Sequence, residues 1–167
     1  MPGSTRSAVT LSVLALLLVV AALWGWSAAT APLPGKVDTP LCVQRAIDAG
    51  EKVYPQDVTV SVFNAGTREG LAGRVMQSFQ DAGFPEGNSG NATGAKVANV
   101  QIWSTEPKSP AVLLVASRLG DDVQVERRDG PGVGVNVIVG DGFTTLVKGP
   151  AGIVAKDDVE ICSPPVD

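Results

Sequence analysis

Residues 64–70 have the side chains and the position in the chain that could hold an anion or a sugar. They read Asn-Ala-Gly-Thr-Arg-Glu-Gly and lie between an expected strand and an expected helix. At such a junction, free backbone N–H groups at the positive end of a helix favour a phosphate or carboxylate. The segment lacks the glycine spacing and the Lys-Ser/Thr ending of nucleotide-binding loops. We predict a structural turn and, as the second interpretation, contact with a glycan or an anionic polymer through Asn64, Gly66, Thr67, Arg68 and Gly70.

A second candidate is the adjacent pair Arg127 and Arg128, whose guanidinium groups could bind a carboxylate or a polymer phosphate. Glu126 and Asp129 flank the pair, which favours an exposed turn with balanced charge. Trp103 could stack on a sugar ring or pack in the core, and the sequence leaves both interpretations open.

The sequence offers little for catalysis. Histidine is absent, which excludes histidine-based triads, Cys–His dyads and Cys/His zinc fingers. The acidic run at residues 157–160 lacks the spacing of a calcium loop and indicates a solvated face. We therefore predict no metal, no cofactor and no catalytic residue; the alternative is a polymer-modifying enzyme that uses carboxylates.

The two cysteines, Cys42 and Cys162, lie near the two ends of the chain after its apolar leader. In an exported protein an even number of cysteines indicates a disulfide. Closing a loop of about 120 residues stabilises a fold by about 4–5 kcal/mol in the chain-entropy description. We predict a structural disulfide, with two free buried thiols as the alternative.

The leader contains a continuous apolar run from residue 9 to residue 26, and extended to Ala29 it matches the roughly 20 residues that cross a bilayer. Arg6 is the nearest charge, so the positive-inside rule predicts a cytoplasmic segment 1–8 and a single-pass plasma-membrane anchor 9–29. The alternative is a cleaved signal peptide, because Ala-Thr-Ala at 29–31 resembles a cleavage site. Both alternatives export the rest of the chain.

After the anchor, residues 30–39 contain two prolines and a glycine, which is typical of a semi-stiff tether. Residues 40–167 then form the expected extracytoplasmic domain. From residue 37 onward the chain has seventeen acidic and eleven basic side chains. This acidic balance excludes nucleic acid as a partner, because it repels phosphate backbones.

Hydrophobic periodicity predicts the elements of the domain. Valines alternate along strands 57–63 and 133–139, and an amphipathic pattern predicts a helix over 68–82, with Thr67 as N-cap and Gly83 as its left-handed end. The remaining expected elements are a short helix after Pro40, a mobile loop at 86–96, a strand at 97–104, a helix from Pro110, and a strand at 122–127. This order predicts an α/β fold: a small mixed sheet with two main helices packed on it, preceded by one transmembrane helix.

Two stretches of this pattern carry a resemblance to a known family. They read VSVFNAGTREGLAGRVMQSFQDAGF at 60–84 and VNVIVGDGF at 135–143. Their order, with a central strand and an Ala-rich helix between them, resembles the LytR C-terminal domain family over residues 57–143. The organisation is similar to stand-alone, membrane-anchored actinobacterial members.

This resemblance implies a role in cell-envelope integrity and membrane-vesicle release. The implied partners are peptidoglycan or a wall glycopolymer, and the LytR–CpsA–Psr ligases that attach such polymers. A homo-oligomeric scaffold shares the same sequence features and stays open.

Overall fold

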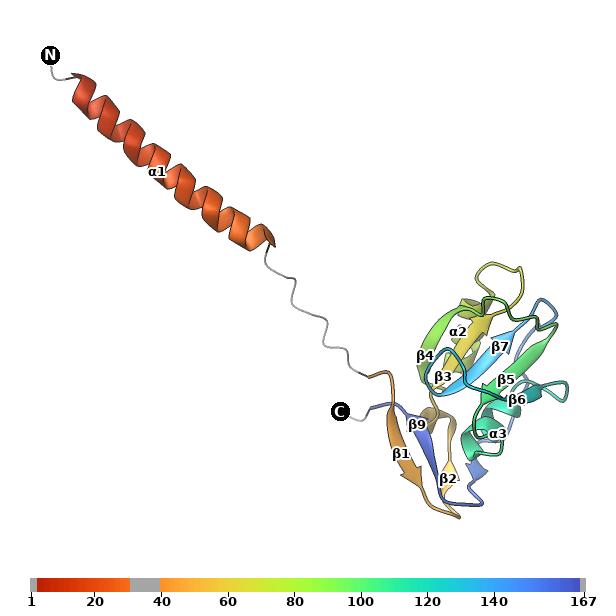
Figure 1. Ribbon diagram of the computed structural model, residues 1–167. Coiled ribbons are helices and arrows are strands. Elements are labelled where there is room, and N and C mark those ends of the chain that lie inside the picture. Colours follow the sequence, from red (N-terminus) through yellow and green to blue (C-terminus); the bar gives the residue numbers. More distant parts are fainter. Residues whose placement is uncertain (1–2, 31–39, 166–167) are drawn as a thin grey trace. The chain divides into compact units, whose positions relative to one another are not determined.

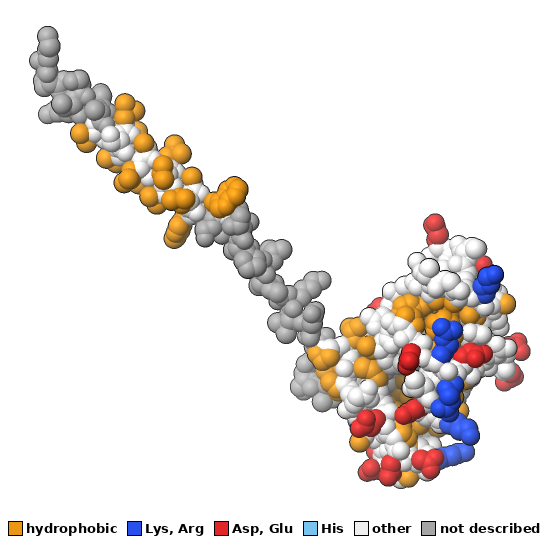
Figure 2. Space-filling model, in the orientation of Figure 1, with side chains coloured by type: hydrophobic (Ala, Val, Ile, Leu, Met, Phe, Trp, Pro, Cys, Tyr) orange, Lys and Arg blue, Asp and Glu red, His pale blue; other side chains and the backbone are white. Residues whose placement is uncertain are grey.

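The computed structural model describes residues 3–30 and 40–165, which form two units that we describe separately. The first is one helix, α1 (Gly3–Thr30). Its window Val9–Trp26 has a mean hydropathy of 2.3, contains no charged residue, and is long and apolar enough to cross a membrane (Figure 2). The helix therefore fits a membrane anchor or a signal sequence. The predicted tether lies outside the described residues except for Thr30, the last residue of α1.

The second unit is built on a five-stranded mixed sheet (Figure 1). Neighbouring strands run parallel, except that β7 and β5 are antiparallel. In spatial order the strands are β4 (Glu86–Asn91), β3 (Val60–Asn64), β7 (Val135–Val139), β5 (Val100–Ser104) and β6 (Gln124–Arg127). The predicted mixed sheet is confirmed.

Both helices of this unit pack on the same face of the sheet. α2 (Leu71–Asp81) and α3 (Pro110–Ala116) share one apolar cluster with alternate residues of β3, β5 and β7. The residues that point to the helices include Val62, Ile102 and Val137, each fully buried. The two-residue period of the valines therefore identifies the helix-facing side of the strands.

The C-terminal end of α2 is as the sequence predicts, whereas its N-terminal end differs. Gly83 takes the left-handed conformation (φ +90°), and the ring of Phe84 packs edge-on against Phe79 with centroids 5.5 Å apart, as predicted. The predicted start is wrong: the N-cap is Gly70 and not Thr67. The helix begins three residues later than expected because residues 66–68 are held in a turn by other contacts, described below.

The opposite face of the sheet is covered by loops. Phe63, Trp103 and Ile138 form a small second cluster, closed by residues 92–97. Next to it, the glycine-rich segment 130–134 lies flat on the strands. The amide of Asn136 accepts from the Gly132 N–H (2.7 Å) and donates to two carbonyl oxygens of the segment, while the Ser61 hydroxyl donates to a third (2.6 Å).

Two short antiparallel sheets complete the domain: β1 (Val43–Ile47) with β9 (Val159–Ser163), and β2 (Lys52–Val53) with β8 (Ile153–Val154). A 3₁₀ turn, η1 (Pro55–Asp57), follows β2. The helix expected after Pro40 is wrong, because this segment is strand β1. Its backbone is paired along its whole length with β9, and a disulfide joins Cys42 to Cys162 with Cα atoms 5.4 Å apart. Long-range pairing overrides the local helix signals here.

The mobile loop expected at 86–96 is also wrong in its first half, which forms β4 beside β3. Glycine is what this pairing requires, because a side chain at Gly87 would meet the Ser61 hydroxyl and the Val60 carbonyl oxygen. The backbone N–H of Asn88 donates to Ser61 Oγ (2.9 Å), and the side-chain oxygen of Asn88 accepts from the Val133 N–H (3.0 Å). The strand is held by its backbone and by polar contacts, so hydrophobic periodicity does not reveal it.

Candidate functional site

The turn at residues 64–70 is closed by its first side chain. Asn64 ends β3 and is buried; its Oδ1 accepts from the Gly66 N–H (2.9 Å) and its Nδ2 donates to the Arg68 carbonyl oxygen (2.8 Å). Gly70 then takes a left-handed conformation (φ +66°) at the start of α2. These contacts bring five predicted site residues together in one turn.

The backbone N–H groups of the turn, which the sequence predicts as a possible anion-binding site, donate to the side chain of Asp141. The Asp141 carboxylate accepts from the backbone N–H groups of Thr67 (2.8 Å) and Arg68 (3.1 Å) and from the Thr67 hydroxyl (3.0 Å). The Arg68 guanidinium donates to the carbonyl oxygens of Asp141 (3.1 Å) and Phe143 (2.9 Å). Gly66 lies so close that a side chain there would collide with the Asp141 carboxyl group. The anion that this turn binds is therefore a side chain of the same protein.

These contacts lower the pKa of Asp141. The hydrogen bond from the Thr67 backbone is the largest cause; those from the Arg68 backbone and the Thr67 hydroxyl, and the charge of Arg68, act in the same direction. Desolvation opposes them by raising the pKa. The folded protein therefore favours the ionised carboxylate that its backbone binds.

Replacing Asp141 with asparagine should lower the melting temperature at neutral pH, because an amide offers one acceptor oxygen and the carboxylate two. The ordinary pKa is 3.8 and the folded pKa is lower, so between these values the unfolded chain binds more protons. The contribution of Asp141 is thus complete above pH 3.8 and is lost as the pH falls through the folded pKa. The melting curves of wild type and Asp141→Asn should converge in strong acid.

Thermal unfolding followed by circular dichroism, from neutral to strongly acidic pH, measures this convergence. Asp122→Asn is the matched control, because Asp122 is exposed and its side chain makes no hydrogen bond within residues 40–165. A difference between wild type and Asp141→Asn that persists unchanged in strong acid contradicts the prediction.

The second predicted pair lies at the other end of the sheet. Arg127 is paired with Ser104, at the end of β5. Asn64 is paired with Val139 of β7, and Val139 is paired with Val100, at the start of β5. The structure therefore does not bring the arginine pair and the turn into one site. The Arg127 guanidinium donates to the Thr105 carbonyl oxygen (3.0 Å).

Arg128 covers Trp103, with its guanidinium carbon 3.8 Å from the centroid of the indole ring. The ring is 7% exposed, and its N–H donates to the side chain of Gln101 (3.0 Å). Of the two roles that the sequence left open for Trp103, the structure supports packing, in the second cluster of the sheet.

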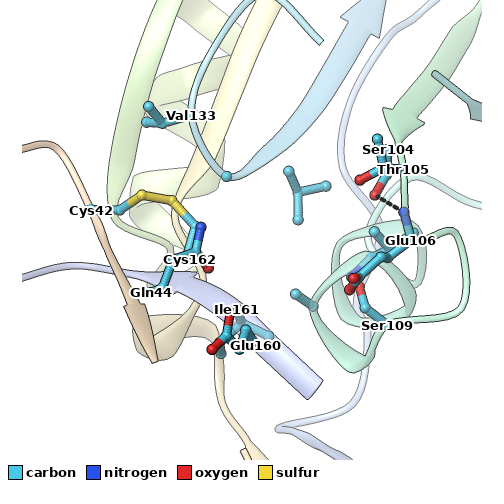
Figure 3. A pocket seen from close by; sticks show the side chains of 14 residues that line it. Cys42, Gln44, Ser104, Thr105, Glu106, Ser109, Val133, Glu160, Ile161 and Cys162 are labelled. Carbon is cyan, nitrogen blue, oxygen red and sulfur yellow. Dashed lines mark hydrogen bonds between the residues drawn. A yellow bond between two sulfur atoms is a disulfide. The ribbon is translucent and has the colours of Figure 1, made fainter. Parts of the chain in front are cut away.

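A hollow beside the disulfide was missed by the sequence analysis. Its volume is about 300 Å³, and it lies between the β1–β9 sheet and the segment that leads into α3 (Figure 3). Figure 3 shows the disulfide along one side, Glu106 and Ser109 across from it, and Glu160 beside Ile161. Its polar wall residues are Gln44, Ser104, Thr105, Glu106, Ser109 and Glu160. They are far apart in sequence, and only the predicted Cys42–Cys162 pairing indicates that β1 and β9 meet.

Among the residues whose side chains are described, no group of three or more potential metal ligands lies together. In the acidic run at 157–160, Asp158 accepts a hydrogen bond from the Ala49 N–H (2.8 Å) and so has a structural contact.

Comparison with known proteins gives one family and one solved structure. The family model described as LytR cell envelope-related transcriptional attenuator matches residues 57–143. The soluble domain of a conserved hypothetical secreted protein from Mycobacterium marinum is 22% identical, over 60% of this chain and 78% of that chain, with a TM-score of 0.40. No curated protein matches the chain.

Proposed function

Because the chain belongs to the family of LytR cell envelope-related transcriptional attenuators, we propose that it is a non-catalytic, membrane-anchored protein whose domain binds peptidoglycan. Membership confirms the resemblance based on residues 60–84 and 135–143, and it gives the protein a role in the cell envelope. The finer statement, that the ligand is the wall polymer itself, is the proposal.

The observation that carries the proposal is the combination of two units on one short chain. A helix able to cross a membrane precedes a domain whose residues 57–143 match the family. The nine intervening residues, 31–39, reach at most about 32 Å when extended. With residues 1–8 in the cytoplasm and 9–29 retained in the plasma membrane, the domain 40–167 lies close to the outer face of the plasma membrane.

The disulfide supports this topology, because such bonds persist in oxidising compartments outside the cytoplasm. At that location the domain meets peptidoglycan and the LytR–CpsA–Psr ligases that act on it. Scaffolding of those ligases, and through it envelope integrity and vesicle release, would follow from binding at the wall. The turn with Asn64, Gly66, Thr67, Arg68 and Gly70, and the pair Arg127 and Arg128, remain candidate contacts.

Co-sedimentation of the full-length chain, in detergent micelles, with purified sacculi tests the proposal. We expect retention that saturates with increasing sacculi. Recovery of the chain in the supernatant at every amount of sacculi overturns it. In-cell crosslinks that trap no ligase would remove the scaffolding role. The enzyme alternative is tested in the same mixtures, because a mass change in added muropeptides would reveal a reaction.

A further inference from the structure

Two segments of the domain that pack against each other carry basic side chains and no acidic ones. They are residues 107–119, which contain α3, and residues 144–156, which contain β8. α3 contacts β8, and the Val147 N–H donates to the Arg118 carbonyl oxygen (2.8 Å). The two segments hold four of the eleven basic side chains from residue 37 onward and none of the seventeen acidic ones. An otherwise acidic domain therefore has one locally basic surface.

The same two segments expose apolar side chains. Leu113, Val147 and Val154 are 40%, 44% and 53% exposed, and they are three of the seven large apolar side chains that are exposed within residues 40–165. Exposed apolar side chains that are scattered singly need no partner, whereas a patch rimmed by polar groups marks a surface that contacts a protein or a membrane.

A cleft between α3 and β8 brings the two kinds of side chain together. Its volume is about 350 Å³, and we call it the α3–β8 cleft. Leu113 and Val154 line it together with Lys108 and Lys156, both of which are exposed. Among the described residues that line the cleft, Asp157 is the one acidic side chain. The surface around the cleft is thus apolar with a positive rim.

We propose that the α3–β8 cleft rests on the surface of an anionic lipid bilayer, the membrane in which α1 anchors the chain. Lys108 and Lys156 lie at the level of the lipid phosphates, and Leu113 and Val154 face the start of the acyl chains. Lysine suits this position, because its apolar stem lies along the interface while its ammonium group reaches the phosphates. The inference rests on the retained anchor of the proposed function and adds a second membrane contact. Part of that contact, residues 144–156, lies beyond the family match, which ends at residue 143.

The chain between anchor and domain is long enough for this contact. Val159 lines the cleft and pairs with Ile47, four residues after Val43, where β1 begins. At about 3.4 Å per residue, these four steps span about 14 Å. Residues 31–39 reach at most about 32 Å, which exceeds that span.

The anchor also makes a weak contact sufficient. One lysine near an anionic membrane surface strengthens binding only about fivefold, which is little for a freely diffusing domain. A short linker instead holds the domain near the bilayer at an effective concentration in the millimolar range. Two lysines and two exposed apolar side chains can then keep the domain on the surface.

Hydrogen exchange of the full-length chain in lipid nanodiscs tests the contact. We expect slower exchange at residues 144–156 in phosphatidylglycerol nanodiscs than in phosphatidylcholine nanodiscs, and we expect added salt to remove the difference. Residues 144–152 belong to no helix or strand, so their amides exchange readily unless the surface is covered.

Charge substitutions locate the contact. Lys108→Glu and Lys156→Glu should each reduce the protection in phosphatidylglycerol by about fivefold or more, and Asp157→Asn should increase it. Lys96→Glu is the matched control, because it makes the same change of charge at an exposed lysine in the loop that covers the opposite face of the sheet. It should exchange as the wild type does. Melting temperatures, measured alongside, establish that a loss of protection does not come from unfolding.

Three results overturn the inference. The first is equal exchange of the wild type in the two lipids. The second is an equal loss of protection in Lys96→Glu and Lys156→Glu, which would reflect the net charge of the domain and not this surface. The third is protection that appears in both lipids and rises with the number of chains per nanodisc, because the occupant of the cleft would then be a second copy of the domain.

This experiment is independent of wall binding, because the nanodiscs contain no peptidoglycan. If sacculi retain the chain but exchange is equal in the two lipids, the inference fails and the proposed function stands. If exchange depends on the lipid but sacculi do not retain the chain, the proposed wall binding fails and the inference stands.

Discussion

Replacing Cys42 and Cys162 together with serine should lower the free energy of unfolding by about 4–5 kcal/mol. The bond closes a loop with a sequence separation of 120, so its loss gives the unfolded chain a large gain in conformational entropy. Urea unfolding measures the change. With Trp24 and Trp26 replaced by phenylalanine, Trp103 is the one remaining tryptophan and reports on the domain alone.

The loss should be concentrated where the disulfide holds an otherwise weakly packed strand. Four of the five residues of β1 are exposed, and Ile47 is its one buried residue. Hydrogen exchange should therefore accelerate first in β1 and β9. Reduction of the wild type should reproduce the behaviour of the double variant and should leave the double variant unchanged. A loss below about 1 kcal/mol would show that the strand pairing holds without the bond.

Most of the elements that the sequence predicted correctly have a strong periodic pattern; α3 is the exception, since its Ser109-Pro110 start indicates the helix. Strands β3 and β7 and helix α2 bury regularly spaced apolar residues, so each local stretch contains its own signal. β4 has no such signal, because its sequence Glu-Gly-Asn-Ser-Gly-Asn pairs through its backbone and through Ser61. β1 depends on β9, more than a hundred residues later, and no local pattern indicates that pairing.

The candidate site shows the same division. The residues of the 64–70 turn could be identified from their types and position, but their partner could not. Asp141 is 74 residues from Thr67, and in the sequence it is one of seventeen acidic residues. The structure shows that the two stretches that carry the family resemblance pair along β3 and β7 and are joined at the end of these strands by this carboxylate. Likewise, the hollow is formed by segments that only the folded chain brings together.

Gly134→Ala should destabilise the domain by about 2–5 kcal/mol, through two separate effects. Gly134 has a left-handed backbone (φ +68°), which costs an alanine about 1–2 kcal/mol. Its Cβ would also collide with the Thr59 carbonyl oxygen, which accepts from the Val135 N–H (3.0 Å) where β3 and β7 pair. That oxygen belongs to the backbone of the sheet, so relieving the collision costs about 1–3 kcal/mol more.

Gly120→Ala isolates the first effect, because Gly120 has a similar backbone (φ +87°) and nothing lies within 4 Å of the position that an added methyl group would take. The difference between the two free energies of unfolding therefore measures the collision at Thr59. Equal destabilisation by the two substitutions would mean that segment 130–134 can move off the sheet freely.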